Sequence, residues 1–297
     1  MGGGTWTSNS YDSYTKITRG MSSASFSTST MGAQEVFQQK HLHPDLNPKH
    51  VLRECVDTEE HPNTLPVILA LDVTGSMGAA AAKVAKALGT IMEDLYASKD
   101  VQDIEFCIMA IGDLYCDRAP IQMSQFESDV RIAEHLDKVW FEYGGGGNSW
   151  ESYTAAWYMG ARHCKLDCWN RGKRGIIITM GDEQINPELN ARELSASVGD
   201  SLQDHVKTKD LYAEASEKFD IYHISVNDTE SSYTFNNGTT GRGTKGRVDS
   251  TWTDVLGQHY IVSTINNLAT TITDIIKSCA AGAPGATGTD SDYGISW

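Results

Sequence analysis

Four short apolar runs alternate with amphipathic segments along this chain. The runs cover residues 66–71, 104–111, 175–180 and 219–226, and they are rich in branched residues, as strands buried on both faces are. The segments between and after them read as helices, over 83–96, 132–139, 151–164, 202–218 and 265–279. Strands that alternate with helices predict an α/β fold, in which helices flank both sides of a central, mostly parallel sheet.

The two ends of the chain and one internal stretch lack this pattern. Residues 1–40 are rich in Gly, Ser, Thr and Tyr, which predicts a flexible N-terminal arm or a strap laid over the domain. The domain would span residues 41–280, with its core over 62–280. Residues 227–251 predict a long polar insertion, and residues 281–297 a flexible C-terminal tail.

Composition narrows the class of protein. The 297 residues suit one large domain, and 40% hydrophobic with 21% charged residues excludes a disordered or coiled-coil chain. The formal net charge of -15 argues against nucleic-acid binding. No apolar run approaches the roughly 18 residues of a membrane helix, and no secretory signal is visible, so we expect a cytoplasmic protein without a membrane partner.

Acidic and hydroxyl side chains follow the predicted strands. The first run is followed by the letters DVTGS, in which Asp72, Thr74 and Ser76 alternate, while Asp113 and Asp182 follow the second and third runs. The carboxyl ends of parallel strands meet at one edge of a sheet, where ligands bind. One carboxylate and two hydroxyls facing a common point suit a hard cation such as Mg²⁺, whereas the structural alternative is a helix cap. Asp113 would support the ligands or contact the ion.

The letters DVTGS after an apolar strand resemble the D-x-S/T-x-S signature of von Willebrand factor type A (vWA) domains, which marks their metal-ion-dependent adhesion site (MIDAS). That family adds a Thr in a glycine-rich loop before a helix, and an Asp after its fourth strand. Here GGGGN at 144–148 and Asp182 stand in matching order. The resemblance covers about residues 62–280, and GDLYCDRAP and GGGGNSWESY resemble bacterial and phage proteins with this domain.

Two positions depart from the vWA pattern. Aligning the helix after the glycine loop places Glu151 where the family has Thr, with Asn148, Ser149 and Ser152 as neighbouring alternatives. The usual Thr-Asp-Gly appears as TMGDE, so Asp182 stands further along its turn. We hypothesise that a Glu in place of Thr adds negative charge, which would strengthen metal binding and weaken the attraction for an acidic partner group.

The resemblance implies recognition rather than catalysis. It implies a divalent-metal-dependent protein-binding module whose Mg²⁺, Mn²⁺ or Ca²⁺ takes an exposed Asp or Glu from a partner protein. Intracellular members of the family are often encoded beside MoxR-type AAA+ ATPases, which implies an adaptor for such an ATPase. In the polar insertion, Arg242, Lys245 and Arg247 are basic residues of an acidic protein and would contact the partner.

A second interpretation is a structural or assembly protein of a phage particle or another complex, in which the metal site serves assembly. Its location would then be the virion rather than the cytoplasm of a bacterial or phage-infected cell. The enzymatic alternative is a serine hydrolase, because TGSMG differs from the G-x-S-x-G nucleophile elbow only at Thr74. Ser76, Asp182 and either His223 or His259 follow the required order, but the mismatch makes catalysis less favoured.

Overall fold

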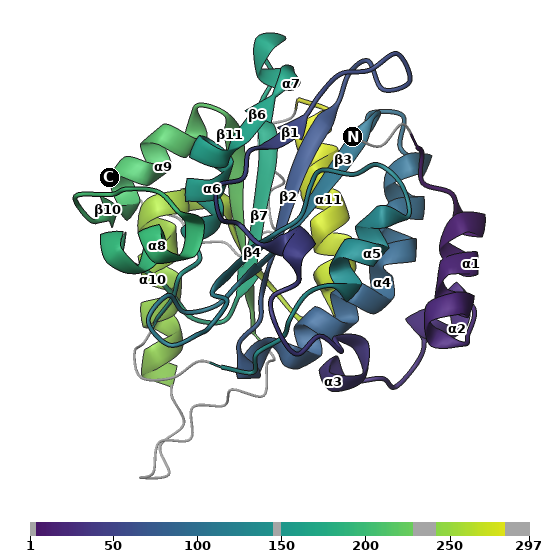
Figure 1. Cartoon of the computed structure of the whole chain (residues 1–297), viewed down its shortest axis with the longest axis horizontal. Helices are drawn as coiled ribbons and strands as arrows, with labels where there is room; N and C mark the ends of the chain where they lie inside the picture. Colours follow the sequence, from purple (N-terminus) through teal and green to yellow (C-terminus); the bar gives the residue numbers. More distant parts are fainter. Residues whose placement is uncertain (1–3, 145–149, 228–241, 283–297) are drawn as a thin grey trace, which may run out of the picture.

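The computed structural model describes residues 4–144, 150–227 and 242–282, without the side chains of residues 242–247. Its central sheet has six strands in the order β12-β11-β7-β2-β3-β4 (Figure 1). They are β2 (Leu65–Asp72), β3 (Ile104–Ile111), β4 (Ile121–Met123), β7 (Gly175–Gly181), β11 (Phe219–Val226) and β12 (Tyr260–Ser263). All neighbours are parallel except β4, which is antiparallel to β3. The predicted fold class is therefore confirmed.

Helices cover both faces of this sheet (Figure 1). One face packs against α4 (Gly78–Ala97), α5 (Arg131–Asp137) and α11 (Leu268–Ala280). The other packs against α6 (Ala155–His163), α8 (Ala191–Val198), α9 (Thr208–Ser216) and α10 (Arg242–Leu256). In β2, Leu69 faces the first core and its neighbours Ile68 and Ala70 face the second, as a period of two requires. A strand buried on both faces has little room for polar side chains, which explains the apolar runs.

Shorter elements complete the chain. Two-stranded pairs are formed by β1 (Arg53–Cys55) with β6 (Cys164–Leu166), β5 (Trp150–Glu151) with β8 (Gln184–Ile185), and β9 (Glu188–Leu189) with β10 (Val206–Lys207). A short helix α7 (Asp167–Asn170) precedes β7, and 3-10 turns cover Pro44–Leu46, Gly75–Met77, Gly257–His259 and Ile265–Asn267. No helix in the described part of the chain is long and apolar enough to cross a membrane.

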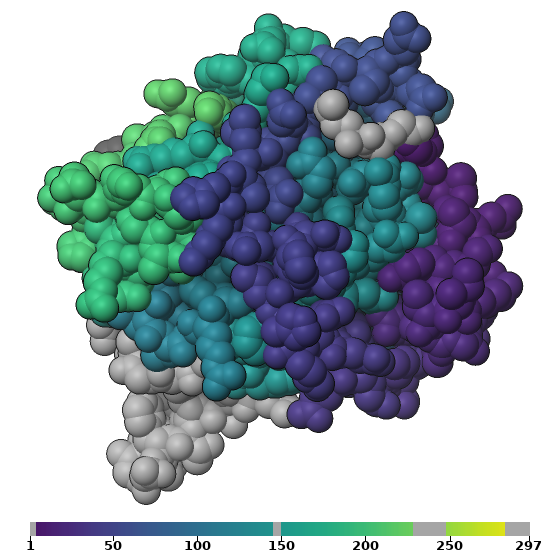
Figure 2. All heavy atoms as spheres, viewed as in Figure 1, coloured from purple at the N-terminus to yellow at the C-terminus, as the bar shows by residue number. Residues whose placement is uncertain are grey.

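Of the two alternatives predicted for the N-terminal segment, a flexible arm and a strap laid over the domain, the structure shows an ordered segment packed on the domain. It forms α1 (Ser8–Arg19), α2 (Ser23–Ser27) and α3 (Ala33–Val36), which lie along one side of the domain (Figures 1 and 2). Aromatic side chains bury these helices against α4 and α5, among them Trp6, Tyr11 and Phe26. Tertiary packing thus makes helices of a Ser-rich sequence whose intrinsic helix propensity is weak.

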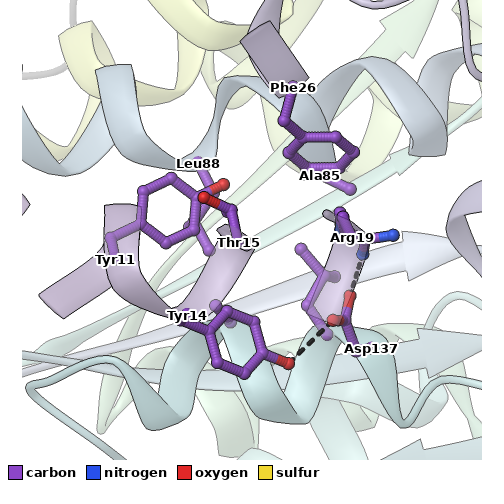
Figure 3. A pocket seen from close by; sticks show the side chains of 10 residues that line it. Tyr11, Tyr14, Thr15, Arg19, Phe26, Ala85, Leu88 and Asp137 are labelled. Carbon is purple, nitrogen blue, oxygen red and sulfur yellow. Dashed lines mark hydrogen bonds and ion pairs between the residues drawn. The ribbon is translucent and has the colours of Figure 1, made fainter. Parts of the chain in front are cut away.

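A partly buried ion pair joins this segment to the domain (Figure 3). The Arg19 guanidinium pairs with the Asp137 carboxylate and lies 4.2 Å from the centre of the Phe26 ring. The Tyr14 hydroxyl donates a hydrogen bond to Asp137 Oδ2 over 2.7 Å. Charge and hydrogen bonds of Asp137 are therefore satisfied within the chain.

The elements that were not predicted include two strands of the central sheet and the helix α10. β4 and β12 are edge strands of only three and four residues, too short to form a periodic pattern. The predicted polar insertion at 227–251 is wrong in its second half, because α10 begins at Arg242. Arg242, Lys245 and Arg247 lie in the first turns of that helix. Their side chains, like residues 228–241 and 283–297, lie outside the description.

Candidate metal centre

Asp72 is the last residue of β2, at the point where the sheet order reverses between β3 and β7. Its Oδ1 accepts hydrogen bonds from the Thr74 main-chain nitrogen at 2.8 Å and from the Thr74 hydroxyl at 2.5 Å. The exposed Gly75 follows, and its nitrogen donates to the Gly144 carbonyl over 3.0 Å. The turn therefore fixes Asp72 and Thr74 beneath the surface and holds the start of the glycine-rich loop above them.

Asp182 comes to the same place from the neighbouring strand. It follows β7, which pairs with β2, and its Oδ1 accepts a hydrogen bond from the Ser76 hydroxyl over 3.1 Å. Ser76 is half-buried at the turn into α4, whereas Asp182 is buried. The structure thus brings together Asp72, Thr74, Ser76 and Asp182, the four residues that the motif and the strand ends selected.

Glu151 is held over the end of β2 by contacts on both sides. Its strand β5 pairs in parallel with β8, which begins two residues after Asp182, so that Glu151 lies opposite Ile185. On the other side, the Ser152 nitrogen donates to the Gly112 carbonyl at the end of β3 over 3.2 Å. Glu151 is only 5% exposed, and its Oε2 has no hydrogen-bond partner among the described residues. The helix predicted from residue 151 begins later, at Ala155, which leaves Glu151 in an extended segment.

One further residue, Tyr153, belongs to the site and was not predicted. The Tyr153 hydroxyl donates to Asp72 Oδ2 over 2.7 Å and accepts from the Glu183 nitrogen over 3.3 Å. The close approach requires a glycine at position 181, because a Cβ there would lie 2.1 Å from the Tyr153 hydroxyl oxygen. Tyr153 therefore fastens the carboxylate of Asp72 to the turn after β7. The only sequence signal was its position two residues after Glu151.

Asp113 has a supporting position at the end of β3. It is fully buried, its Oδ1 accepts from the Tyr115 nitrogen over 3.0 Å, and its own nitrogen donates to Asp117 Oδ2 over 2.8 Å. These hydrogen bonds shape the turn that carries Gly112 toward Ser152. Asn148, the other candidate ligand from the glycine-rich loop, lies outside the described residues, as does Ser149.

Electrostatics at this edge is dominated by negative charge. Burial, followed by the charge of Asp182, raises the pKa of Asp72 to about 7. Burial and then the charges of Asp72 and Asp113 raise the pKa of Glu151 to about 10, and burial with Asp182 and Asp72 raises that of Glu183 to about 7. None of the ion pairs among the described residues includes Asp72, Glu151 or Glu183. Among the side chains that the structure describes, no cation pairs with these three carboxyls, of which Asp72 and Glu151 are buried and Glu183 is half-buried.

The donor set fits a hard cation better than a transition metal. Within the described ranges, no three His, Cys, Asp or Glu side chains are arranged as a group that could hold a metal. At the end of β2, however, the hydroxyl oxygens of Thr74 and Ser76 stand beside the carboxylates of Asp72 and Asp182. Oxygen ligands of this kind suit Mg²⁺ or Ca²⁺, and the orphaned oxygen of Glu151 is a further donor for such an ion.

The serine hydrolase alternative requires a histidine between Ser76 and an acid. His223 is fully buried, its Nδ1 shares a hydrogen bond with the Thr179 hydroxyl at 2.9 Å, and its ring stacks on Trp252 with centroids 3.5 Å apart. His259 Nδ1 contacts the Ile221 carbonyl at 3.1 Å. The hydroxyl of Ser76 instead donates directly to Asp182. These contacts do not follow the Ser-His-Asp order in which the imidazole takes the serine proton.

Comparison with known proteins gives similarity in structure only. No protein-family model and no curated protein sequence matches this chain. The pilus adhesin SpaC from Lactobacillus rhamnosus GG, in its open conformation, is 11% identical over 76% of this chain, with a TM-score of 0.44. The conserved hypothetical protein BatB from Bacteroides thetaiotaomicron is 14% identical over 73% of this chain, also with a TM-score of 0.44.

A third solved structure carries a metal. It is proximal thread matrix protein 1 from the mussel byssus, with a zinc-occupied MIDAS motif, which is 11% identical over 73% of this chain at a TM-score of 0.44. The similar region is 31% of the SpaC chain and 48% of the mussel chain, but 99% of BatB. This chain therefore spans about a third of SpaC and about half of the mussel protein. These structures are of the vWA type.

Proposed function

We propose that this protein is a divalent-metal-dependent protein-binding module, and that Asp72, Thr74, Ser76 and Asp182 hold the ion. The observation that carries the proposal is the group of buried carboxyls at the strand ends. Among the described residues, Asp72 and Glu151 have no ion pair, and Glu151 Oε2 has no hydrogen-bond partner. Burying charge without compensation is costly, so such a group favours an external cation. Mg²⁺, Mn²⁺ and Ca²⁺ all accept oxygen ligands.

Each residue has a distinct task in this proposal. Thr74 and Tyr153 donate hydrogen bonds to the two oxygens of Asp72 and so fix its orientation. Asp182 is held by Ser76, which lies at the half-buried border of the site. A bound ion would supply positive charge at this edge and accept a ligand from outside. Because Gly75 is exposed, a partner can approach from the side of the turn.

The biological setting stays a proposal that rests on resemblance. We propose a cytoplasmic adaptor, with an AAA+ ATPase of the MoxR type as its partner, and Arg242, Lys245 and Arg247 as partner contacts. An assembly role in a phage particle or another complex is the alternative. Binding is preferred to catalysis because Ser76 is hydrogen-bonded to an acid and the nearby His223 is stacked on Trp252.

The test is the thermal midpoint of the full chain in EDTA and in Mg²⁺, Mn²⁺ or Ca²⁺. An ion present at about 100 times its Kd should stabilise the protein by about 2.7 kcal/mol, which raises the midpoint by roughly 5 °C. Asp72→Ala should lose the shift, whereas Asp254→Ala, at an exposed acidic residue of α10, should keep it. A shift that survives Asp72→Ala, or the absence of a shift with every ion, would overturn the metal site.

A further inference from the structure

A cavity of about 840 Å³ lies at the amino ends of the central parallel strands, at the edge of the sheet opposite to the candidate metal centre. Its lining includes Leu65 at the start of β2, residues 171–174 before β7, and Asp220 near the start of β11. Trp169 of α7, which is drawn at the top of Figure 1, belongs to the same lining. The volume lies within the usual range of ligand sites, about 300–1,000 Å³.

Two arginines of this lining are already neutralised within the chain. The Arg171 guanidinium pairs with the Asp57 carboxylate and donates a hydrogen bond to the Thr64 carbonyl over 2.8 Å. The Arg174 guanidinium pairs with the Asp220 carboxylate at 2.5 Å. These pairs shape the wall of the cavity and leave little arginine charge for a ligand.

Two lysines of the lining keep their charge. Lys99 follows α4 and Lys173 precedes β7, and both are exposed. Neither belongs to any ion pair among the described residues. The exposed Asp100, also in the lining, offsets one of the two charges. The cavity thus retains positive charge on a chain whose formal charge is -15, which makes it a local site for an anion.

Trp169 adds an apolar surface beside this charge. Its side chain is 43% exposed, although burying an aromatic ring of this size is favourable. The turn after α7 ties it to Lys173, because the Lys173 nitrogen donates to the Cys168 carbonyl over 2.9 Å and the Gly172 nitrogen donates to the Trp169 carbonyl over 3.0 Å. A ligand that uses both side chains needs an anionic group next to an apolar one.

The surroundings favour separate carboxylates over a phosphate. A phosphate site typically uses arginine forks or the amino ends of helices, where the partial charge is positive. Here both arginines are paired, and the neighbouring helices present their carboxyl ends: α4 ends at Ala97 and α11 at Ala280. Those ends carry partial negative charge, which opposes a doubly charged group most strongly. Singly charged carboxylates that are spaced along a peptide match the two lysines better.

We propose that this cavity binds an acidic peptide segment of a partner protein, in which carboxylates pair with Lys99 and Lys173 and an aromatic side chain packs on Trp169. The site is distinct from the candidate metal centre and requires no metal. Because the two sites lie at opposite edges of the sheet, one chain can hold two partners at the same time.

The probe is a capped, fluorescently labelled pentapeptide, EEFEE, whose binding to the full chain is followed by fluorescence anisotropy. EDTA keeps the candidate metal centre out of the measurement, and about 150 mM salt screens charges beyond roughly 8 Å. The peptide QQFQQ lacks the carboxylates, and EEAEE lacks the aromatic ring. The double variant Lys99→Glu/Lys173→Glu reverses the charge of the cavity. Its matched control is Lys40→Glu/Lys209→Glu, which changes the net charge equally at two exposed lysines outside the lining.

The unchanged chain should bind EEFEE more tightly than QQFQQ. The Lys99→Glu/Lys173→Glu variant should weaken EEFEE binding about tenfold, because two attractive charge pairs become repulsive, whereas the control variant should keep the affinity of the unchanged chain. Trp169→Ala should weaken EEFEE about fivefold and leave EEAEE unaffected, because only the former peptide has a ring to pack there. Asp72→Ala should bind EEFEE as the unchanged chain does.

Failure of EEFEE to bind the unchanged chain at up to about 1 mM would overturn the proposal. So would equal losses in the cavity variant and its control, or a Trp169→Ala loss that is the same for EEFEE and EEAEE. If Asp72→Ala alone abolishes binding in EDTA, the peptide occupies the other edge of the sheet and the proposal is wrong. The proposed metal centre is tested separately by its thermal shift, so either site can fail without the other.

The chain also contains an acidic and aromatic sequence of its own beyond the described residues, with Asp290, Asp292 and Tyr293. The variant Asp290→Asn/Asp292→Asn distinguishes this occupant from a partner. If a partner segment is the occupant, the variant should bind EEFEE with the affinity of the unchanged chain. Binding that becomes about tenfold tighter would show that the chain's own acids compete for the cavity, and it would overturn the assignment to a partner.

Discussion

Two regions of this molecule withdraw carboxylates from water, one partly and one fully, and they compensate the charge in different ways. Under the N-terminal helices, Asp137 receives the Arg19 guanidinium and a hydrogen bond of 2.7 Å from the Tyr14 hydroxyl (Figure 3). At the carboxyl edge of the sheet, Asp72 receives a hydrogen bond of the same length from the Tyr153 hydroxyl. Its charged neighbours, however, are other acids, led by Asp182.

The difference separates a structural contact from a candidate binding site. Burial raises the pKa of Asp137, but Arg19 opposes that effect by stabilising the ionised form. Nothing comparable acts on Glu151, for which burial and every neighbouring acid push the pKa in the same direction. A buried acid with its cation is complete within the chain, whereas a buried group of acids needs a cation from outside. The following substitutions test that contrast.

The largest effect is expected from removing the internal cation. Arg19→Met leaves Asp137 without its charge partner under α1, and we expect it to lower the free energy of unfolding by about 3 kcal/mol. Urea unfolding in EDTA measures the change. Lys165→Met, in the exposed pair with Glu54, should cost less than about 1 kcal/mol. Equal losses in the two variants would show that the partly buried pair of Arg19 and Asp137 does not hold the N-terminal helices in place.

The buried His135 tests the same effect of burial on a group that is positively charged when ionised, so that burial lowers its pKa instead of raising it. His135 on α5 is buried, its Nδ1 has no partner among the described residues, and burial, aided by Lys138, lowers its pKa from 6.5 to about 4. Between these values only the unfolded chain binds the proton, so the folded state loses stability as the pH falls. The loss is about 1.4 kcal/mol per pH unit, or about 2 kcal/mol at pH 5.

The variant His135→Leu should therefore lose less stability between pH 7.5 and pH 5 than the unchanged chain does. The difference between the two chains is the measured quantity, because other groups titrate in both. Asp45 and Arg53 also act on the His135 ring and remain in the variant. His41→Leu, at an exposed position, is the control and should leave the pH dependence as it is. Parallel pH profiles for His135→Leu and the unchanged chain would contradict the prediction.

Burial of strands on both faces of the sheet explains which parts of the fold the sequence predicts. β3 and β11 have the bounds expected from their apolar runs, because a strand covered on both faces is built mainly from apolar residues. β4 has a buried Gln at its centre, whose amide donates to the Trp140 carbonyl, so it does not read as a strand. The helix α1 forms because Tyr11 and Trp6 pack on the domain, and its Ser-rich sequence does not reveal that contact.

The candidate site, too, could be predicted only in part, because some of its contacts join residues far apart in sequence. Asp72, Thr74 and Ser76 are close in sequence and form a recognisable pattern, and the end of β7 adds Asp182 through sheet order. Tyr153 could not be identified, because its role depends on a distance across the sheet edge to Asp72. Periodicity also placed Glu151 at the start of a helix, whereas pairing with β8 makes the segment extended. Pairings over long sequence separations decide both cases.

The smallest and sharpest effect should come from the two tyrosines, each of which donates to a carboxylate over 2.7 Å, Tyr14 to the half-buried Asp137 and Tyr153 to the buried Asp72. Tyr14→Phe should lower the free energy of unfolding by about 1 kcal/mol, equally in EDTA and in Mg²⁺, because Arg19 still neutralises Asp137. Tyr153→Phe should cost about 1 kcal/mol more in Mg²⁺ than in EDTA, because the hydroxyl orients Asp72 and its loss weakens metal binding about tenfold. Urea unfolding of both variants in both buffers measures the difference. If the metal changes the cost of both substitutions equally, Asp72 is no more a metal ligand than Asp137 is.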